Sequence, residues 1–332
     1  MPLILDVDTG IDDALALLFA AASPYVELLA VTCVSGNVPA RQVEQNTRSV
    51  LELAGRGDVE VALGRETPLV KPLEIAPETH GPYGLGYAKF PPARRPLSER
   101  HAVDVIVEAA RARPGEITLV TLGPLTNLAL ALEREPNLPR LLRAYALMGG
   151  AYRTPGNTTP TAEWNIHVDP EAAKAVFAAW GAALDHPGAP RRPLAIGLDV
   201  TERVRFLPEH LDRLIAARGG DADEPITRFV SDALRFYFEF HARYDGFYGA
   251  VIHDPFAVAA VLDRSLVQTQ PVHVDVETSP GLANGMTIAD WRGLTARPAN
   301  LDIAVDADAA AFLDRFIERV GGLVTRPPTV AI

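Results

Sequence analysis

The sequence predicts an α/β protein built on an open, mainly parallel sheet with helices on both faces. Strand-like apolar runs alternate with helix-like segments through most of the 332 residues, which is the pattern of βαβ units. Polar residues and turn residues follow several of these runs directly, as in Asp6–Asp13 and Ser35–Asn37. Because ligand sites in such sheets lie at the carboxyl ends of the strands, a functional site is expected there.

The predicted strands are short apolar runs that end at turn residues. In chain order they are Leu3–Val7, Leu28–Val34, Ile117–Leu122, Ala144–Met148, Leu194–Val200, Val272–Val276 and Met286–Ala289. The predicted helices are Asp13–Ala22, Ala40–Ala54, Ala102–Ala112, Leu125–Glu133, Pro170–Ala179, Pro208–Ala217, Ile226–Ala242, Pro255–Leu262 and Ala309–Val320. Together these elements describe a Rossmann-like sheet with a mixed edge, in one domain over residues 1–332.

The composition excludes several classes of protein. Hydrophobic residues at 48% and charged residues at 22% are ordinary for a globular protein with a substantial core. The net charge of −11, with no run rich in Lys or Arg, argues against nucleic acid or a membrane surface as partner. The single cysteine, Cys33, excludes an internal disulfide framework and fits a reducing compartment. No signal peptide and no apolar stretch of about 20 residues is evident, so a cytoplasmic protein is expected.

The most informative segment is Asp6–Asp13, which places four carboxylates within eight residues at a strand-to-helix turn. Like charges this close repel each other, so the arrangement is costly unless a cation lies among them. Oxygen-only donors suit a hard divalent cation, with Ca²⁺ or Mg²⁺ as the leading candidates. The alternative is that Asp12 and Asp13 only complement the positive end of a helix.

Further segments combine polar side chains with turns. Asn37 could simply cap a turn, and Asp254 before Pro255 is a good helix N-cap. His253 by itself is more often a structural histidine than a catalyst. The remaining candidates in such segments are His80, Asn157, Glu163 and Asn165. Each is a weak signal alone, and the combination is the stronger observation.

Taken together, these segments resemble the inosine–uridine-type nucleoside hydrolase family, from Pro2 to at least Asp290. The matching blocks are DVDTGIDDALAL, VSGN, LGPLTN, MGGAYRTPGNTTPTAEWNIHVDPEAA and HDP, in the expected order. The resemblance implies the nucleoside hydrolase fold, tightly bound Ca²⁺, and hydrolysis of the N-glycosidic bond of ribonucleosides to free base and ribose. It also implies a role in purine and pyrimidine salvage and assembly into a homodimer or homotetramer.

The resemblance also assigns roles to individual residues. The metal would be held by Asp8, Asp13, Asp254 and the backbone carbonyl of Leu122. Asp8 would also take the proton of the attacking water, and His253 would protonate the departing base. Asp6 would be a structural acceptor beneath the site. The substrate-binding residues would be Asp12, Asn37 and Asn165 for the 2′- and 3′-hydroxyls, Asn157 and Glu163 for the 5′-hydroxyl, and His80.

This assignment suits the chemistry of glycosidic cleavage. The reaction passes through an oxocarbenium-like state, which needs negative potential near the sugar ring and an activated water opposite the base. A divalent cation lowers the pKa of a bound water, and a histidine can protonate the leaving group. The matching blocks contain almost no cations, with Arg153 as the exception, so nucleosides are expected as substrates and nucleotides are not.

The base pocket is less well defined by the sequence. Pro82 and Tyr83 stand where the family usually has a small polar or acidic residue, which puts the base preference in doubt. The aromatic candidates for this pocket are Tyr83, Phe247, Tyr248 and Trp291.

Two other functions stay open at this point. A haloacid-dehalogenase-type phosphatase would use Asp6 as nucleophile, Asp8 as acid and a later lysine. Lys71, Lys89 and Lys174 are the only lysines, and none follows a strand in a suitable context. A non-catalytic, calcium-dependent protein that binds nucleosides or ribose would keep the sugar contacts but lose Asp8 or the acid, and neither loss is seen. Release of reducing sugar from a nucleoside separates the hydrolase from both alternatives.

Overall fold

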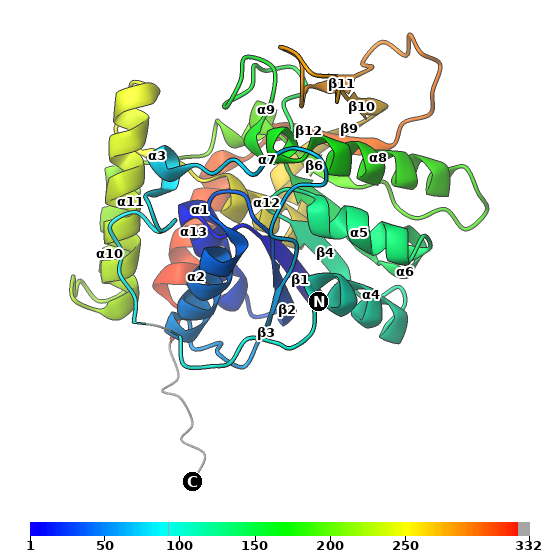
Figure 1. Cartoon of the computed structure of the whole chain (residues 1–332). Coiled ribbons are helices and arrows are strands. Elements are labelled where there is room, and N and C mark those ends of the chain that lie inside the picture. The colour runs from blue at the N-terminus through cyan, green and yellow to red at the C-terminus, as the bar shows by residue number, and fades with distance from the viewer. Residues whose placement is uncertain (92, 325–332) are drawn as a thin grey trace.

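An eight-stranded sheet forms the centre of the computed structural model, which describes residues 1–91 and 93–324 (Figure 1). Its strands are β1 (Pro2–Val7), β2 (Glu27–Cys33), β3 (Glu60–Leu63), β4 (Thr118–Thr121), β5 (Ala144–Met148), β6 (Leu194–Ile196), β9 (Val267–Val272) and β12 (Leu301–Ala307). Their order is β3-β2-β1-β4-β5-β6-β12-β9, and only β12 and β9 pair antiparallel. The predicted mainly parallel sheet with a mixed edge is therefore confirmed.

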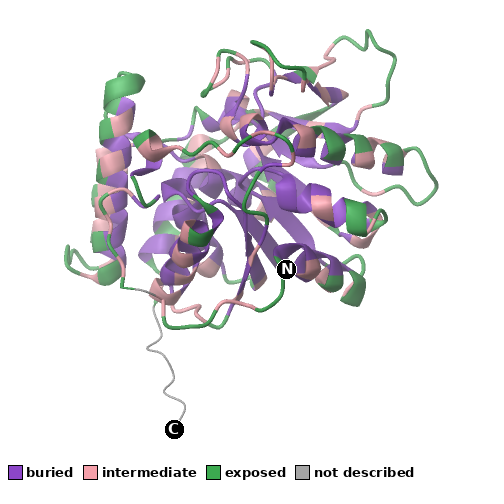
Figure 2. Ribbon diagram, in the orientation of Figure 1, coloured by how far each residue is buried: buried purple, intermediate pink, exposed green. Residues whose placement is uncertain are grey.

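Helices cover both faces of the sheet and enclose two apolar clusters, shown as the purple interior of Figure 2. β4 is buried at every residue, as expected for a central parallel strand that is covered on both faces. One face carries α1 (Ile11–Ala21), α2 (Ala40–Leu53), α10 (Pro208–Ala217), α11 (Pro225–Tyr244), α12 (His253–Leu262) and α13 (Ala309–Gly321). The other carries α4 (Ala102–Ala112), α5 (Thr126–Arg134), α6 (Leu138–Leu141) and α8 (Pro170–Leu184).

Every helix predicted from the sequence is present, and α8 extends furthest beyond its predicted end, from Ala179 to Leu184. Several short elements were not predicted. They are the helices α3 (Pro77–His80), α6 and α7 (Trp164–Val168), a 3-10 turn at Arg264–Leu266, and the antiparallel pair of β7 (Arg205–Phe206) with β8 (Ala250–Val251). β3 and β12 were also missed, and β9 was predicted only at its last residue, Val272. β12 shows the signal that was available, because apolar residues alternate with Asp302 and Asp306 along it.

The predicted strand Leu194–Val200 is wrong in its second half. β6 ends at Ile196, and the short helix α9 (Leu198–Thr201) follows it. The strand ends because the backbone turns here into a helix: the N–H groups of Val200 and Thr201 both donate to the Gly197 carbonyl at 3.2 Å.

The predicted strand Val272–Val276 is also divided. β9 ends at Val272, while β10 (Val274–Val276) pairs with β11 (Thr287–Ala289) in a separate two-stranded sheet. A strand that leaves one sheet for another has no break in its apolar pattern, so the sequence does not reveal the change.

The direction of the strand order reverses between β1 and β4. The chain adds β2 and β3 on one side of β1, and β4, β5 and β6 on the other. Loops that follow β1 and β4 diverge at such a point and open a crevice at the carboxyl ends of the strands. Asp8 follows β1 directly and Leu122 follows β4 directly, so two predicted metal ligands lie at this crevice.

Among residues 1–91 and 93–324, no helix combines the length and the apolar character needed to cross a membrane. The predicted domain over residues 1–332 includes residues 92 and 325–332, which lie outside the described residues.

Candidate active site

A cavity of about 890 Å³ is lined by residues that follow β1, β2, β4 and β5. Asp8 and Asp13 lie behind its wall and are buried. The wall itself contains nine of the residues that were predicted from the sequence: Asp12, Asn37, His80, Leu122, Asn157, Glu163, Asn165, His253 and Asp254. The fold therefore brings segments from both ends of the chain to one cavity.

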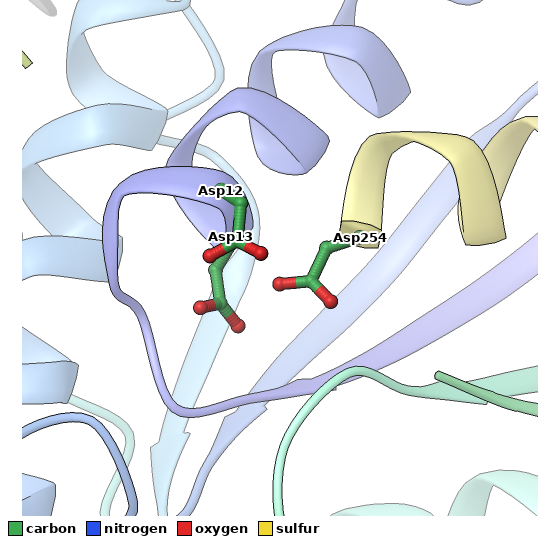
Figure 3. Close-up of side chains that lie close together, drawn as sticks. All are labelled: Asp12, Asp13 and Asp254. Carbon is green, nitrogen blue, oxygen red and sulfur yellow. The ribbon is translucent and has the colours of Figure 1, made fainter. Parts of the chain in front are cut away.

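Three carboxylates meet at the N-termini of α1 and α12, as Figure 3 shows. Asp12 and Asp13 lie in the first turn of α1, and Asp254 lies in the first turn of α12. One oxygen of each carboxylate lies within 4.8 Å of the other two. We call Asp12, Asp13 and Asp254 the acidic trio.

Asp8 lies beside the acidic trio and is held by the backbone. Its Oδ2 accepts a hydrogen bond from the Asn37 N–H at 2.9 Å, and its own N–H donates to Asp13 Oδ1 at 3.2 Å. A Cβ atom added at Gly36 would lie 2.1 Å from Asp8 Oδ2, and one at Gly123 would lie 2.8 Å from Oδ1. Only glycine allows the loops after β2 and β4 to approach the carboxylate this closely.

Burial raises the pKa of every carboxyl group in this cluster. The pKa of Asp12 rises to about 8 and that of Asp13 to about 6, with burial as the main cause. The pKa values of Asp8 and Asp254 are raised well above their usual range, first by burial and then by the charges of neighbouring aspartates. A cation among these groups would reverse the effect, since a nearby opposite charge favours the ionised carboxylate.

The donor set fits a hard divalent cation. Carboxylates and a backbone carbonyl offer only oxygen ligands, which Ca²⁺ and Mg²⁺ prefer. The Leu122 carbonyl accepts from Asn165 Nδ2 at 2.6 Å, which uses one of its two lone pairs and leaves the other free for an ion.

The trio overlaps with the predicted ligand set without matching it fully. Asp13 and Asp254 are common to both, and Asp8 and Leu122 border the trio. Asp12, which the resemblance assigns to the ribose, is the third member of the trio. Asp12 lines the cavity as well, as do the predicted metal ligands Leu122 and Asp254.

The residues predicted to bind the sugar are fixed before any ligand arrives. Glu163 caps α7, and its carboxylate accepts from the N–H groups of Gly150, Asn165 and Ile166 at 2.9, 2.8 and 3.1 Å. Burial raises the pKa of Glu163. Asn157 Oδ1 accepts from the backbone N–H of α7's first residue at 3.0 Å. These contacts orient both side chains at the cavity wall.

Asp6 lies beneath the site in the arrangement expected of a structural acceptor. Its Oδ1 accepts from Thr32 Oγ1 at 2.5 Å and from Asn127 Nδ2 at 2.8 Å. Burial raises the pKa of Asp6 to about 7.

Two of the three histidines that line the cavity, His80 and His253, were predicted from the sequence. His253 Nδ1 lies 2.8 Å from Thr201 Oγ1, and His80 Nδ1 accepts from the Ile11 N–H at 3.2 Å. Burial lowers the pKa of both rings to about 3. Both imidazoles are therefore neutral at pH 7 in the free protein.

Residues 3–314 match the family model described as inosine-uridine preferring nucleoside hydrolase. The chain belongs to this family. The inosine-uridine preferring nucleoside hydrolase of Leishmania major is 37% identical over 325 residues, which cover 96% of this chain and 98% of that protein. The pyrimidine-specific ribonucleoside hydrolase RihA of an Enterobacter species is 38% identical over 321 residues, covering 96% and 97%. The structure of a purine-preferring ribonucleoside hydrolase from Gardnerella vaginalis has a TM-score of 0.88 at 31% identity, covering 98% of this chain and 99% of that one.

The protein is thus a nucleoside hydrolase, an enzyme that hydrolyses ribonucleosides, and the predicted family and enzyme class are confirmed. A phosphatase of the haloacid-dehalogenase type is ruled out by the match over nearly the whole chain. The acidic trio supplies the kind of cluster that a metal-dependent member of this family needs.

Sequence reasoning missed several residues of this nucleoside hydrolase that line the cavity. Tyr237, His241 and Asp245 follow each other at intervals of four residues on α11 and at its end, and all three line the cavity. This spacing places them on one helix face, so a polar stripe at helical period was the available signal. Glu202 and Arg205, from the segment after β6, line the cavity without any comparable pattern.

The four aromatic candidates for the base pocket are placed differently from one another. Phe247 lines the cavity. Tyr83 and Tyr248 are 71% and 52% exposed, and Trp291 packs under the Arg153 guanidinium, 3.7 Å from the ring centre. Within the described part of the chain, these last three are not among the cavity-lining residues.

Proposed function

We propose that this nucleoside hydrolase uses bound Ca²⁺ to cleave the N-glycosidic bond of ribonucleosides into free base and ribose. The observation that carries the proposal is the buried acidic trio beside Asp8 at the wall of an 890 Å³ cavity. Buried carboxylates this close are stable together in ionised form only with a cation among them. Ca²⁺ fits better than Mg²⁺ because it accepts a larger and more flexible set of oxygen ligands, which leaves room for substrate hydroxyls.

Asp8, Asp13, Asp254 and the Leu122 carbonyl would hold the ion. When bound, Ca²⁺ would lower the pKa of a neighbouring water and bind ribose hydroxyls. Asp12 would turn its carboxylate to the 2′- and 3′-hydroxyls.

Asp8 is the general base in this proposal. The Asn37 N–H fixes one carboxylate oxygen at 2.9 Å, and the close approach of Gly36 and Gly123 prevents the side chain from rotating away. The surrounding carboxylates provide the negative potential that stabilises positive charge on the sugar ring in the transition state.

The sugar is held by side chains with fixed orientations. Asn37 Nδ2 donates to Asp13 Oδ2 at 3.3 Å, and Asn165 Nδ2 donates to the Leu122 carbonyl at 2.6 Å. Their amide oxygens are then directed to hydroxyl donors of the ribose, with Asn157 and Glu163 at the 5′-hydroxyl. Binding energy from these hydroxyls, remote from the scissile bond, helps to distort the sugar towards the transition state.

His253 acts on the departing base, with His80 as a neighbouring substrate contact. The Thr201 hydroxyl occupies His253 Nδ1 at 2.8 Å, which leaves Nε2 as the nitrogen for the base. Negative charge that develops on the departing base favours the protonated imidazole and offsets the effect of burial on its pKa.

The test is the release of reducing sugar from inosine, adenosine, guanosine, uridine and cytidine, with bound Ca²⁺ measured on the same protein. The relatives are named for different bases, so the panel also ranks the bases. Ribose release from at least one nucleoside supports the proposal. If none of the five is hydrolysed while Ca²⁺ is bound, common nucleosides are not the substrate and the proposal fails.

Calcium removal should destabilise the fold. At a Ca²⁺ concentration of about 100 times its Kd, binding should stabilise the folded state by about 2.7 kcal/mol. The gain in Tm should be larger at pH 8 than at pH 5, because protons compete with the metal for the carboxylates. Thermal melts with Ca²⁺ and with EGTA, each at pH 5 and pH 8, measure the gain in Tm. Asp254→Asn is the control, and its Tm should no longer depend on Ca²⁺. A Tm that is the same with Ca²⁺ and with EGTA at both pH values would contradict a calcium site.

Nucleosides should be hydrolysed faster than their 5′-monophosphates, by about 10²-fold in kcat/KM. The reason is that a phosphate would meet the buried carboxylate of Glu163, and juxtaposed like charges cost several kcal/mol. Parallel assays with uridine and uridine 5′-monophosphate measure the ratio. Similar rates for the two would show that the 5′ side is not closed to phosphate.

The remaining expectations from the sequence stay predictions. They are a role in nucleoside salvage, a cytoplasmic location, a single domain and a homodimer or homotetramer. Light scattering during size-exclusion chromatography measures the last of these.

A further inference from the structure

A chain of hydrogen bonds joins Asp245, His241 and Val251 at the wall of the cavity. His241 Nδ1 lies 2.6 Å from Asp245 Oδ2, and His241 Nε2 accepts from the Val251 N–H at 3.2 Å. A carboxylate at Nδ1 fixes the proton on that nitrogen, so Nε2 is the acceptor. Both ring nitrogens are therefore engaged within the protein.

Packing holds the His241 ring in this orientation. Its side chain is 6% exposed and lies between Tyr237 and Phe247, with ring centres 4.7 and 5.2 Å away. The Arg205 guanidinium covers Phe247 at 4.5 Å from the ring centre.

Asp245 is the C-cap residue of α11, and the backbone at this helix end fixes its position. Its N–H donates to the His241 carbonyl at 2.9 Å, one helical turn back. Gly246 follows with a φ of +73°, a left-handed conformation that glycine adopts readily and that ends helices. The carboxylate of Asp245 is thus held next to the His241 ring.

The contact to Val251 has a direct structural consequence. Val251 ends β8, a strand of two residues, and α12 starts at His253. The residue between them, Ile252, gives α12 no side-chain cap, and its own N–H donates to the Val204 carbonyl at 3.2 Å. The first turn of α12 therefore follows directly on backbone that is held by the Val204 carbonyl and by His241.

We propose that His241, oriented by Asp245, is a positioning residue that sets the place of His253 and Asp254 through Val251. The inference rests on the proposed function, in which His253 is the leaving-group acid and Asp254 a metal ligand. The His241 ring is not itself a proton donor to substrate. A proton on Nε2 would remove the acceptor that the Val251 N–H needs, and Nδ1 faces Asp245.

Two amide variants of His241 test which of its ring nitrogens is needed to hold Val251. A glutamine amide extends to about the place of Nε2 of a histidine, and an asparagine amide to about the place of Nδ1, and both offer an oxygen acceptor. His241→Gln should therefore keep an acceptor for the Val251 N–H, while His241→Asn should keep only a partner for Asp245. We expect His241→Gln to resemble the wild type and His241→Asn to be impaired.

Three measurements separate positioning from other roles. In His241→Asn, hydrogen exchange of the Val251 amide should be faster by about tenfold or more, since a buried N–H loses its partner. Ca²⁺ affinity should fall by about 10–100-fold, as is typical when a residue that orients a ligand is lost. kcat/KM on the best nucleoside should fall by up to about 10²-fold through misplacement of reacting groups.

A second pair of variants covers the case in which both His241 variants unfold. Asp245 has a side chain that is 48% exposed, so its replacement disturbs the core little. Asp245→Asn keeps an acceptor for Nδ1 and should behave as wild type. Asp245→Ala frees the imidazole to change tautomer and should show the effects of His241→Asn in weaker form.

The outcomes are distinct. Wild-type exchange of the Val251 amide in His241→Asn, or equal behaviour of His241→Asn and His241→Gln in all three measurements, would overturn the positioning role. Loss of activity in His241→Asn with unchanged exchange and unchanged Ca²⁺ affinity would overturn it in favour of direct contact with substrate. If the wild type releases no ribose, the proposed function fails, while the exchange and Ca²⁺ measurements still decide the positioning role.

Discussion

Asp8→Asn should reduce ribose release by about 10²–10⁴-fold, the usual contribution of a general base. Asparagine keeps an oxygen that accepts from the Asn37 N–H, and it fits between Gly36 and Gly123 as aspartate does. The variant should therefore fold, and only the proton acceptor and one negative charge are removed. Initial rates on the best nucleoside of the panel, at saturating Ca²⁺, measure the effect.

The control for Asp8→Asn is Asp6→Asn. Asp6 lies beneath the site and accepts from Thr32 and Asn127, so its loss should lower stability and leave kcat within about tenfold. If Asp8→Asn retains near wild-type kcat while Asp6→Asn does not, the base has been assigned to the wrong aspartate.

His253→Ala should lose about 10²–10⁴-fold in kcat/KM on inosine or uridine, because the departing base is then no longer protonated. The same variant should hydrolyse p-nitrophenyl riboside at a nearly unchanged rate, because that leaving group needs no proton. The comparison of the two substrates isolates leaving-group activation from any general loss of the site.

Thr201→Val is the matched control for this histidine. It removes the hydroxyl at 2.8 Å from His253 Nδ1 but leaves the ring in place. A smaller loss with the same substrate dependence is expected, since the tautomer of His253 is no longer fixed. Equal losses of His253→Ala on both substrates would remove the acid role.

Much of the fold follows from local pattern. Leu3, Ile4 and Leu5 of β1 are apolar because both faces of the sheet are covered there, and α1 begins after the turn at Thr9 and Gly10. Such elements are determined by residues adjacent in sequence, so their type and approximate bounds are predictable. The second half of Leu194–Val200 was mispredicted because its apolar residues suit a buried helix such as α9 as well as a buried strand.

The candidate site also has one part that the local sequence predicts and one part that depends on tertiary packing. Asp8, Asp12 and Asp13 share one strand-to-helix turn, so the sequence alone indicated a cluster of carboxylates and a hard cation. The carboxylate from α12 that completes the acidic trio could be assigned from the sequence only through the family resemblance. Its distance to Asp12 and Asp13 depends on how α1 and α12 lie against the sheet.

The sequence by itself therefore determined the fold class, the family and the chemistry of the acidic turn. The tertiary structure decided which carboxylates form the trio, that burial raises their pKa values, and that His241 anchors Val251. The physical reason is that local spacing fixes only the geometry of neighbouring residues. Burial and contacts between distant segments arise from side-chain packing across helices and sheet, which no single stretch of sequence encodes.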